Sequence, residues 1–287
     1  MKNNEYRLRI GDSVLGMRFR PARYTALFRD YLGRECAREE PDVRMDFRIT
    51  SRQQEAPVDN SLFTSKLLTN RGFEISGGLI KGHYDRAAQY GKIRVHEALM
   101  VVPTIRVFEQ LLYQAFFSSK DGGSRDAYLI HSCGVIHGGS GYLFVGPSES
   151  GKSTVARLSL PDTVLNDELN LLLFSDNKIT LCGTPFNGLF KEKSEGYCEL
   201  KSVFLLRQGL EHKLVREPGA EAVKAVLREI VPPIGLDEVI TPQAREEMLD
   251  LAIRLRETVP VYRMEFQPNR GFWQLIDQKI GNERGRE

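Results

Sequence analysis

The stretch that decides the fold is YLFVGPSESGKST, residues 142–154. Residues 142–146 are apolar enough for a buried strand, and VARLSL, residues 155–160, has the character of a helix. Between them lies a short loop that contains glycine, serine and lysine. A strand that enters a helix through such a loop is typical of a phosphate-binding site.

The loop matches the pattern G-x-x-x-x-G-K-[ST] through Gly146, Gly151, Lys152 and Ser153. Glycines allow a tight turn, and the N–H groups at the start of the helix attract anionic oxygens. Lys152 would reach the β- and γ-phosphates of a nucleotide, and the Ser153 hydroxyl would bind Mg²⁺. We expect the nucleotide to contact Gly146, Ser148, Ser150, Gly151, Lys152, Ser153 and Thr154.

Glu149 is unexpected inside this loop, because a carboxylate directed at phosphates would repel them. One interpretation is that the side chain points to solvent while the backbone N–H points inward. The alternative is that the carboxylate meets a cation on a substrate or on a neighbouring subunit.

Two acidic residues, Asp167 and Glu168, end an apolar strand predicted over residues 163–167. They follow Lys152 by 15 and 16 residues. Adjacent acids near a phosphate loop can divide the chemistry, with one binding Mg²⁺ and the other accepting a proton from the attacking hydroxyl. The alternative is a strand end with two solvated carboxylates.

His131 lies inside a second apolar strand, predicted over residues 127–136. The glycine-rich turn at residues 138–141 makes this strand a hairpin neighbour of residues 142–146. His131 could therefore lie near the phosphates and orient an acid there, or it could be a core histidine with satisfied hydrogen bonds. The sequence pattern favours neither of these two roles for His131.

Composition narrows the class of protein. The 287 residues have a formal charge of +2, which argues against a dedicated nucleic-acid-binding protein. No apolar run approaches the roughly 20 residues that span a bilayer, and the first ten residues lack the apolar core of a signal peptide. Four widely spaced cysteines favour free thiols in a reducing compartment. We therefore expect a cytoplasmic protein without nucleic-acid or membrane partners.

The pattern predicts two domains. Residues 1–122 are expected to form a small α+β unit. Its strands are predicted at residues 6–10 and 43–49, with a hairpin around Gly77 and Gly78 and helices at 23–32 and 103–119. A polar stretch with Pro57 is expected to be a loop.

Residues 123–287 are expected to form an α/β domain with a mixed sheet. Besides the elements above, we predict a hairpin, two further strands and three helices in this part. They are the hairpin 169–183, the strands 202–206 and 261–266, and the helices 221–231, 242–257 and 272–280.

The ordered motifs LIHSCGVI, GPSESGKST, LNDE and GTPF together resemble the catalytic domain of the HPr kinase/phosphorylase-like kinases. These kinases have the phosphoenolpyruvate-carboxykinase-like P-loop fold. The resemblance covers roughly residues 125–280. It implies an ATP- and Mg²⁺-dependent kinase that transfers the γ-phosphoryl group to a hydroxyl.

The resemblance also implies roles for particular residues. Asp167 corresponds to the catalytic acid and His131 to the catalytic histidine, while Lys152 belongs to the phosphate loop. Glu168 and Ser153 would bind the metal. This chain has Thr154 and an Asp-Glu pair where HPr kinases usually have an acid and two aspartates.

These differences leave the acceptor open. We expect a serine of a peptide or protein, and the N-terminal unit is a candidate for its recognition. The alternatives are free serine or another small molecule, phosphorolysis of a seryl phosphate, and a nucleotide-gated peptide-binding protein without transfer. The resemblance also allows a homo-oligomer.

Overall fold

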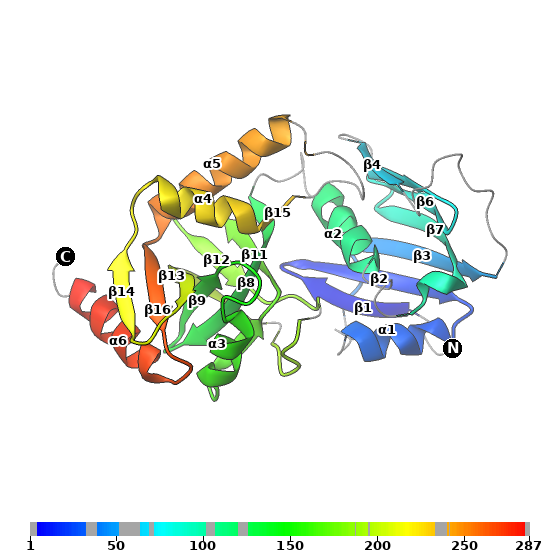
Figure 1. Cartoon of the computed structure of the whole chain (residues 1–287). Coiled ribbons are helices and arrows are strands. Elements are labelled where there is room, and N and C mark those ends of the chain that lie inside the picture. The colour runs from blue at the N-terminus through cyan, green and yellow to red at the C-terminus, as the bar shows by residue number, and fades with distance from the viewer. Residues whose placement is uncertain are drawn as a thin grey trace. The chain divides into compact units, whose positions relative to one another are not determined.

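The computed structural model describes residues 5–32, 39–51, 64–68, 72–101, 107–119, 126–186, 188–194, 196–232, 240 and 242–284. The chain divides into two compact units (Figure 1). The second unit contains Asp126–Pro232 and the residues from Pro242 onward. The predicted domain boundary at residues 122 and 123, and the predicted loop with Pro57, lie outside the described residues.

In its described residues, the first unit is a seven-stranded sheet with two α-helices and one short 3-10 helix. Its elements are β1 Glu5–Ile10, β2 Ser13–Arg20, α1 Tyr24–Leu32, β3 Val43–Thr50, β4 Thr64–Leu68, β5 Gly72–Ser76, β6 Ile80–Asp85, β7 Tyr90–His96, η1 Glu97–Leu99 and α2 Val107–Ser119. The strand order is β1-β2-β3-β7-β6-β5-β4.

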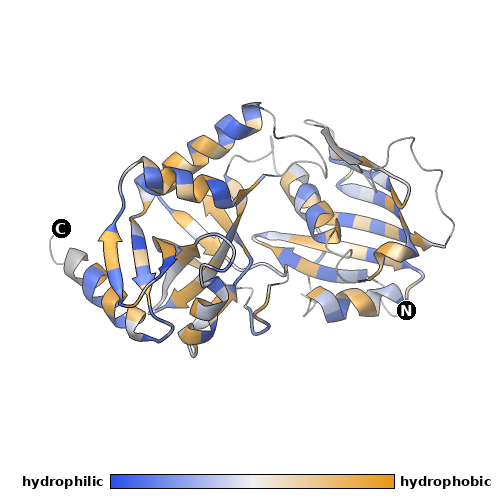
Figure 2. Ribbon diagram, in the orientation of Figure 1, coloured by the Kyte–Doolittle hydropathy of each residue, from blue (hydrophilic) through white to orange (hydrophobic). Residues whose placement is uncertain are grey.

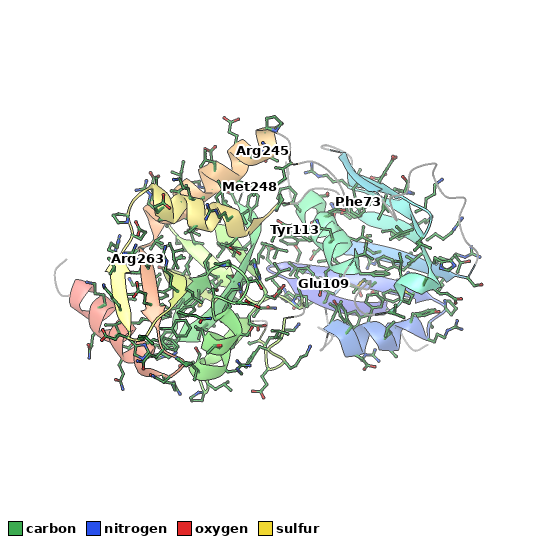
Figure 3. The ribbon with its side chains drawn as sticks, in the orientation of Figure 1. Phe73, Glu109, Tyr113, Arg245, Met248 and Arg263 are labelled. Atoms are coloured by element: carbon green, nitrogen blue, oxygen red, sulfur yellow. The ribbon has the colours of Figure 1, made fainter. Side chains whose placement is uncertain are left out.

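One face of this sheet is apolar and covered by helices. Along β3, and along β2 from Met17 onward, the side chains alternate between buried and more exposed positions, as a strand with one core face requires (Figure 2). Phe19 and Phe47 of these strands pack against Phe28 of α1 and Phe108 of α2, with ring centroids 4.3 to 6.4 Å apart. Tyr113, labelled in Figure 3, continues the buried face of α2.

The strand predictions at residues 6–10 and 43–49 are confirmed, as is the hairpin, in which β5 pairs with β6 antiparallel. The helix predicted from residue 103 is described from Val107 onward. β2 and β7 were not predicted from the sequence, because each contains a glycine and keeps only a short alternating run, at residues 17–20 and 92–95.

The described part of the second unit contains nine strands in a mixed sheet, together with four helices. Its elements are β8 Ala127–His137, β9 Ser140–Val145, α3 Lys152–Ser159, β10 Thr163–Asn166, β11 Leu169–Phe174, β12 Ile179–Cys182, β13 Tyr197–Gln208, β14 Lys213–Arg216, α4 Ala220–Glu229, β15 Ile230–Val231, α5 Pro242–Thr258, β16 Val261–Phe266 and α6 Gly271–Arg284. The mixed α/β class predicted for this part is confirmed.

The core of this unit lies between the sheet and two helices. Apolar side chains from β9, β13 and β16 pack against α3 and α6, with Trp273 of α6 among them. On the same sheet, Arg263 of β16 pairs with Glu217 at 3.5 Å (Figure 3). None of the described helices combines the length and the apolar character needed to cross a membrane.

The long strand β8 changes partners at its middle. Its first half pairs with β11 and β15, and its second half pairs with β9 and β10. The hairpin between β8 and β9 turns through Gly138 and Gly139, both with positive φ (55° and 78°). The sheet therefore branches around His131 and Ser132, where the chain leaves β9 and later crosses from β10 to β11.

Candidate active site

The loop of residues 146–151 connects the end of β9 to the start of α3. Its backbone is sharply turned, with φ of 66° at Glu149 and 109° at Gly151. Any side chain at Gly151 would put its Cβ 2.7 Å from the Phe266 ring, so this position accepts only glycine without a rearrangement. The predicted order of elements, a strand followed by a loop and a helix, is confirmed.

Glu149 is exposed to solvent, an observation that fits both of its interpretations. Its carbonyl oxygen accepts a hydrogen bond from Gln208 Nε2 at 2.8 Å, which ties the loop to the end of β13. A positive φ at a residue other than glycine is uncommon and raises the energy of the loop. The Gln208 contact helps to hold this conformation.

Lys152 is buried and folds back over the loop. Its ammonium donates to the carbonyl oxygens of Gly146 and Pro147 at 2.7 and 3.1 Å. Desolvation lowers the pKa of Lys152, while the nearby carboxylates of Glu229 and Glu168 act in the opposite direction. An ammonium carries three donors, so a phosphate oxygen could be bound alongside these two carbonyl groups or in exchange for one of them.

The first turn of α3 presents backbone N–H groups beside this ammonium. The helix begins at Lys152 after Gly151, which provides no side-chain cap, and the next residues, Ser153 and Thr154, are half-buried. The first N–H groups of any helix lack partners within the helix and favour anions. Of the two remaining loop serines, Ser148 is exposed, whereas Ser150 is buried with no hydrogen-bond partner for its hydroxyl among the described residues.

Asn166 organises the turn that carries the two acids, a role that the sequence did not reveal. Its side-chain oxygen accepts from the backbone N–H groups of Glu168 and Leu169 at 2.7 and 3.2 Å. Its amide group donates to carbonyl oxygens of Thr184 and Phe186 at 3.1 and 2.8 Å. A fully buried amide with these partners fixes where the neighbouring carboxylates lie.

Asp167 is almost fully buried, with 3% of its surface exposed. Its Oδ1 accepts from the Phe190 backbone N–H at 3.1 Å, and its Oδ2 has no hydrogen-bond partner among the described residues. Gly188 lies so close that an added Cβ would overlap Oδ1. A buried carboxylate oxygen without a partner is costly, so a cation or a donated proton at Oδ2 would lower the energy of the site.

His131 lies between two glutamates. Its Nδ1 is 2.9 Å from Glu229 Oε2, and its Nε2 is 3.7 Å from Glu168 Oε2. The carboxylates of Glu168 and Glu229 raise the pKa of His131 from 6.5 to about 9, against the effects of burial and of Lys152. The imidazole is therefore cationic at neutral pH and is not a free base.

Glu229 was missed by the sequence analysis. It is the last residue of α4, and the two residues of β15 that follow pair with Ile130 and Leu129 of β8. That pairing places Glu229 beside His131, 98 residues away along the chain. A glutamate at the end of a predicted helix carries no local signal of this position.

These residues suit a hard divalent cation bound together with phosphate oxygens. Asp167, Glu168 and Ser153 supply oxygen atoms, which Mg²⁺ prefers. The described residues contain no group of three or more His, Cys, Asp or Glu side chains that could hold a metal. Mg²⁺ is commonly held by one or two carboxylates plus the phosphates of a substrate, and the donor set fits that mode.

Comparison with known proteins gives little further information. No protein-family model and no curated protein sequence matches the chain. Among solved structures, the chain is similar to the Hpr(Ser) kinase/phosphatase from Coxiella burnetii, with a TM-score of 0.30 and 14% sequence identity. The match covers 55% of this chain and 97% of that one. At this TM-score the similarity says nothing about activity.

Proposed function

We propose that the protein is a kinase that transfers the γ-phosphoryl group of ATP to a hydroxyl, with a serine of a peptide or protein as the acceptor. The observation that carries the proposal is that a buried ammonium and a buried carboxylate lie in the same region, near the branch in the sheet. Lys152 begins the helix after the glycine loop, and Asp167 has an oxygen without a partner. The Asp167 carboxylate is among the charges that act to raise the pKa of Lys152, after Glu229 and Glu168.

Lys152 and the first N–H groups of α3 bind and orient the phosphates and stabilise the negative charge that moves to the leaving oxygen. Asp167 accepts the proton of the acceptor hydroxyl at Oδ2. Mg²⁺, when bound by Ser153 and Glu168, supplies further neutralisation of phosphate charge. Positioning and electrostatics account for most of the rate enhancement in reactions of this class.

Three residues position these groups. Asn166 holds the turn that carries Asp167 and Glu168, because its side-chain oxygen accepts hydrogen bonds from the backbone N–H groups of the two residues that follow Asp167. Glu229 fixes the imidazole of His131 through Nδ1. The cationic ring then lies beside Glu168 and restrains its carboxylate.

The experiment compares wild-type protein with Asp167→Asn, which preserves shape and removes the proton acceptor. ATP binding is measured by calorimetry, and transfer is followed with γ-labelled ATP and Mg²⁺ against free serine and a library of seryl peptides. We expect the variant to bind ATP as the wild type does and to lose transfer by about 10²-fold or more. Asp176→Asn, at an exposed turn, is the control and should behave as wild type.

Each outcome has a defined meaning. Normal transfer by Asp167→Asn would show that the proton acceptor is another group. ATP binding by the wild type without ADP or a phosphorylated acceptor would identify a nucleotide-gated binding protein instead. No ATP binding by the wild type would overturn the proposal as a whole.

A further inference from the structure

The face of the first unit's sheet that α1 and α2 do not cover is strongly cationic. Side chains alternate along a strand, so the residues on either side of the buried Phe19 in β2, and of the buried Phe47 in β3, point to this opposite face. The face is concave, with a volume of about 550 Å³ lined by residues of β2, β3, β6 and β7. Five lysines and arginines line it, against the single carboxylate of Asp46.

The strand register places four of these cations in one row across the sheet. Arg20 pairs with Arg48, Arg48 pairs with Arg94, and Arg94 pairs with Lys81. Neighbouring strands lie only about 4.7–4.9 Å apart, so like charges at paired positions repel one another and destabilise the sheet. All four side chains are exposed, and Lys92 of the next row adds a fifth cation.

Four of the five cations on this face have no ion-pair partner among the described residues. Among the described residues, no carboxylate lies within 4.0 Å of the charged groups of Arg20, Arg48, Lys81 or Lys92. Asp46 instead accepts a hydrogen bond from the Tyr90 hydroxyl at 2.8 Å. Repulsion between the neighbouring Arg20 and Arg48 therefore lowers the stability of the free protein, and an anionic ligand would reduce this repulsion.

The geometry favours an extended polypeptide as the anion. Along one strand, cations such as Lys92 and Arg94 repeat every second residue, or about 6.6–6.8 Å, which is also the repeat of alternate side chains in an extended peptide. Nucleic-acid-binding sheets stack bases on exposed aromatic rings. At this face Phe47 is 1% exposed, and Tyr90 is half-buried with its hydroxyl bound to Asp46 and its ring beneath the Lys92 ammonium, so both rings are already engaged.

We propose that this cationic face is a docking surface for an acidic, extended polypeptide segment with carboxylates on alternate residues. The segment would lie along β7. One of its carboxylates would lie over the row, where Arg94 is flanked by Arg48 and Lys81, and a carboxylate two residues further along would face Lys92. We also infer that the segment belongs to the polypeptide whose hydroxyl is phosphorylated, and this inference rests on the proposed function.

The test uses the full chain without nucleotide, so it does not depend on kinase activity. The probe is fluorescein-labelled decaglutamate in low-salt buffer, and its binding is followed by fluorescence anisotropy. We expect the wild type to bind, with an affinity that falls as salt is added. The double variant Arg48→Gln/Lys81→Gln should bind about tenfold more weakly, because two direct contacts with carboxylates are lost.

The control removes the same charge elsewhere. Lys178 and Lys213 are exposed residues of the second unit, and Lys178→Gln/Lys213→Gln should bind decaglutamate as the wild type does. Thermal unfolding gives a second readout: Arg48→Gln/Lys81→Gln should unfold at a higher temperature than wild type, since repulsion in the row is relieved. If the double variant loses binding and yet unfolds at a higher temperature, misfolding cannot explain the loss.

Three results would overturn the proposal. The first is that decaglutamate does not bind to the wild type. The second is equal binding by wild type and Arg48→Gln/Lys81→Gln. The third is binding of a ten-nucleotide oligothymidylate as tight as that of decaglutamate, which would assign the face to nucleic acid. Decaglutamate binding without phosphoryl transfer would leave the docking surface standing and refute only the proposed function.

Discussion

The substitution Glu229→Gln tests the arrangement around His131. Glutamine can still accept a hydrogen bond from Nδ1, so the change removes a negative charge and keeps the geometry at 2.9 Å. The rise in the pKa of His131 from 6.5 to about 9 corresponds to roughly 3 kcal/mol. Because the imidazole side chain is 30% exposed, screening by solvent reduces this to roughly 1–2 kcal/mol.

Glu168 and Glu229 share this stabilisation, and Glu229 makes the shorter contact. We therefore expect Glu229→Gln to lower the pKa of His131 toward 6.5, by roughly one pH unit. The measurement is an NMR titration of the imidazole carbons in metal-free protein. The His131 signal among the five histidines is identified by its loss in His131→Gln.

The same substitution should change how stability depends on pH. His131 binds its proton more tightly when folded, so its contribution is fully present below the unfolded pKa of 6.5 and is lost as pH rises through about 9. Wild-type stability should thus fall over that interval, and the fall should be smaller in Glu229→Gln.

Glu221→Gln, on an exposed part of the same helix, is the control and should leave the pKa of His131 unchanged. The reasoning fails if the pKa of wild-type His131 lies near 6.5, or if Glu229→Gln does not lower it.

Two further substitutions test the scaffold by urea unfolding, with the fluorescence of Trp273, the single tryptophan, as the reporter. Asn166→Ala should cost about 3–5 kcal/mol, since it leaves several buried backbone groups without partners; a cost under about 1 kcal/mol would mean that the turn does not depend on this amide. Gly151→Ala should cost about 2–4 kcal/mol, from the positive φ and the overlap with Phe266, and unchanged stability would show that the loop relaxes freely.

The sequence predicted those parts of the site that depend on neighbours along the chain. The strand, loop and helix around Lys152 follow from a local pattern, and the acids Asp167 and Glu168 follow from their place at a strand end. His131 was left open between a core residue and a site residue, because the choice depends on what lies beside its strand. The structure places it against two glutamates, of which only Glu168 was a candidate.

The remaining features depend on contacts between distant segments. Glu229 reaches the site through a pairing of only two residues between β15 and β8, too short to leave a pattern. The row of cations on the first unit is also invisible in the sequence, because Arg20, Arg48, Lys81 and Arg94 belong to four different strands. Each looks like an ordinary exposed charge until the register of the strands is known.

The two proposed binding regions share an energetic property that separates them from the scaffold. The free protein holds a buried Asp167 oxygen without a described partner and a row of opposed cations, and both raise its energy. Neutralising either charge, through Asp167→Asn or Arg48→Gln/Lys81→Gln, should therefore stabilise the protein while it impairs binding or transfer. Substitutions of Asn166 or Gly151 should lower stability and activity together. The charge substitutions should therefore raise stability while the Asn166 and Gly151 substitutions lower it, as expected when stability is given up for function. If the charge substitutions also lowered stability, the charges would serve the fold alone.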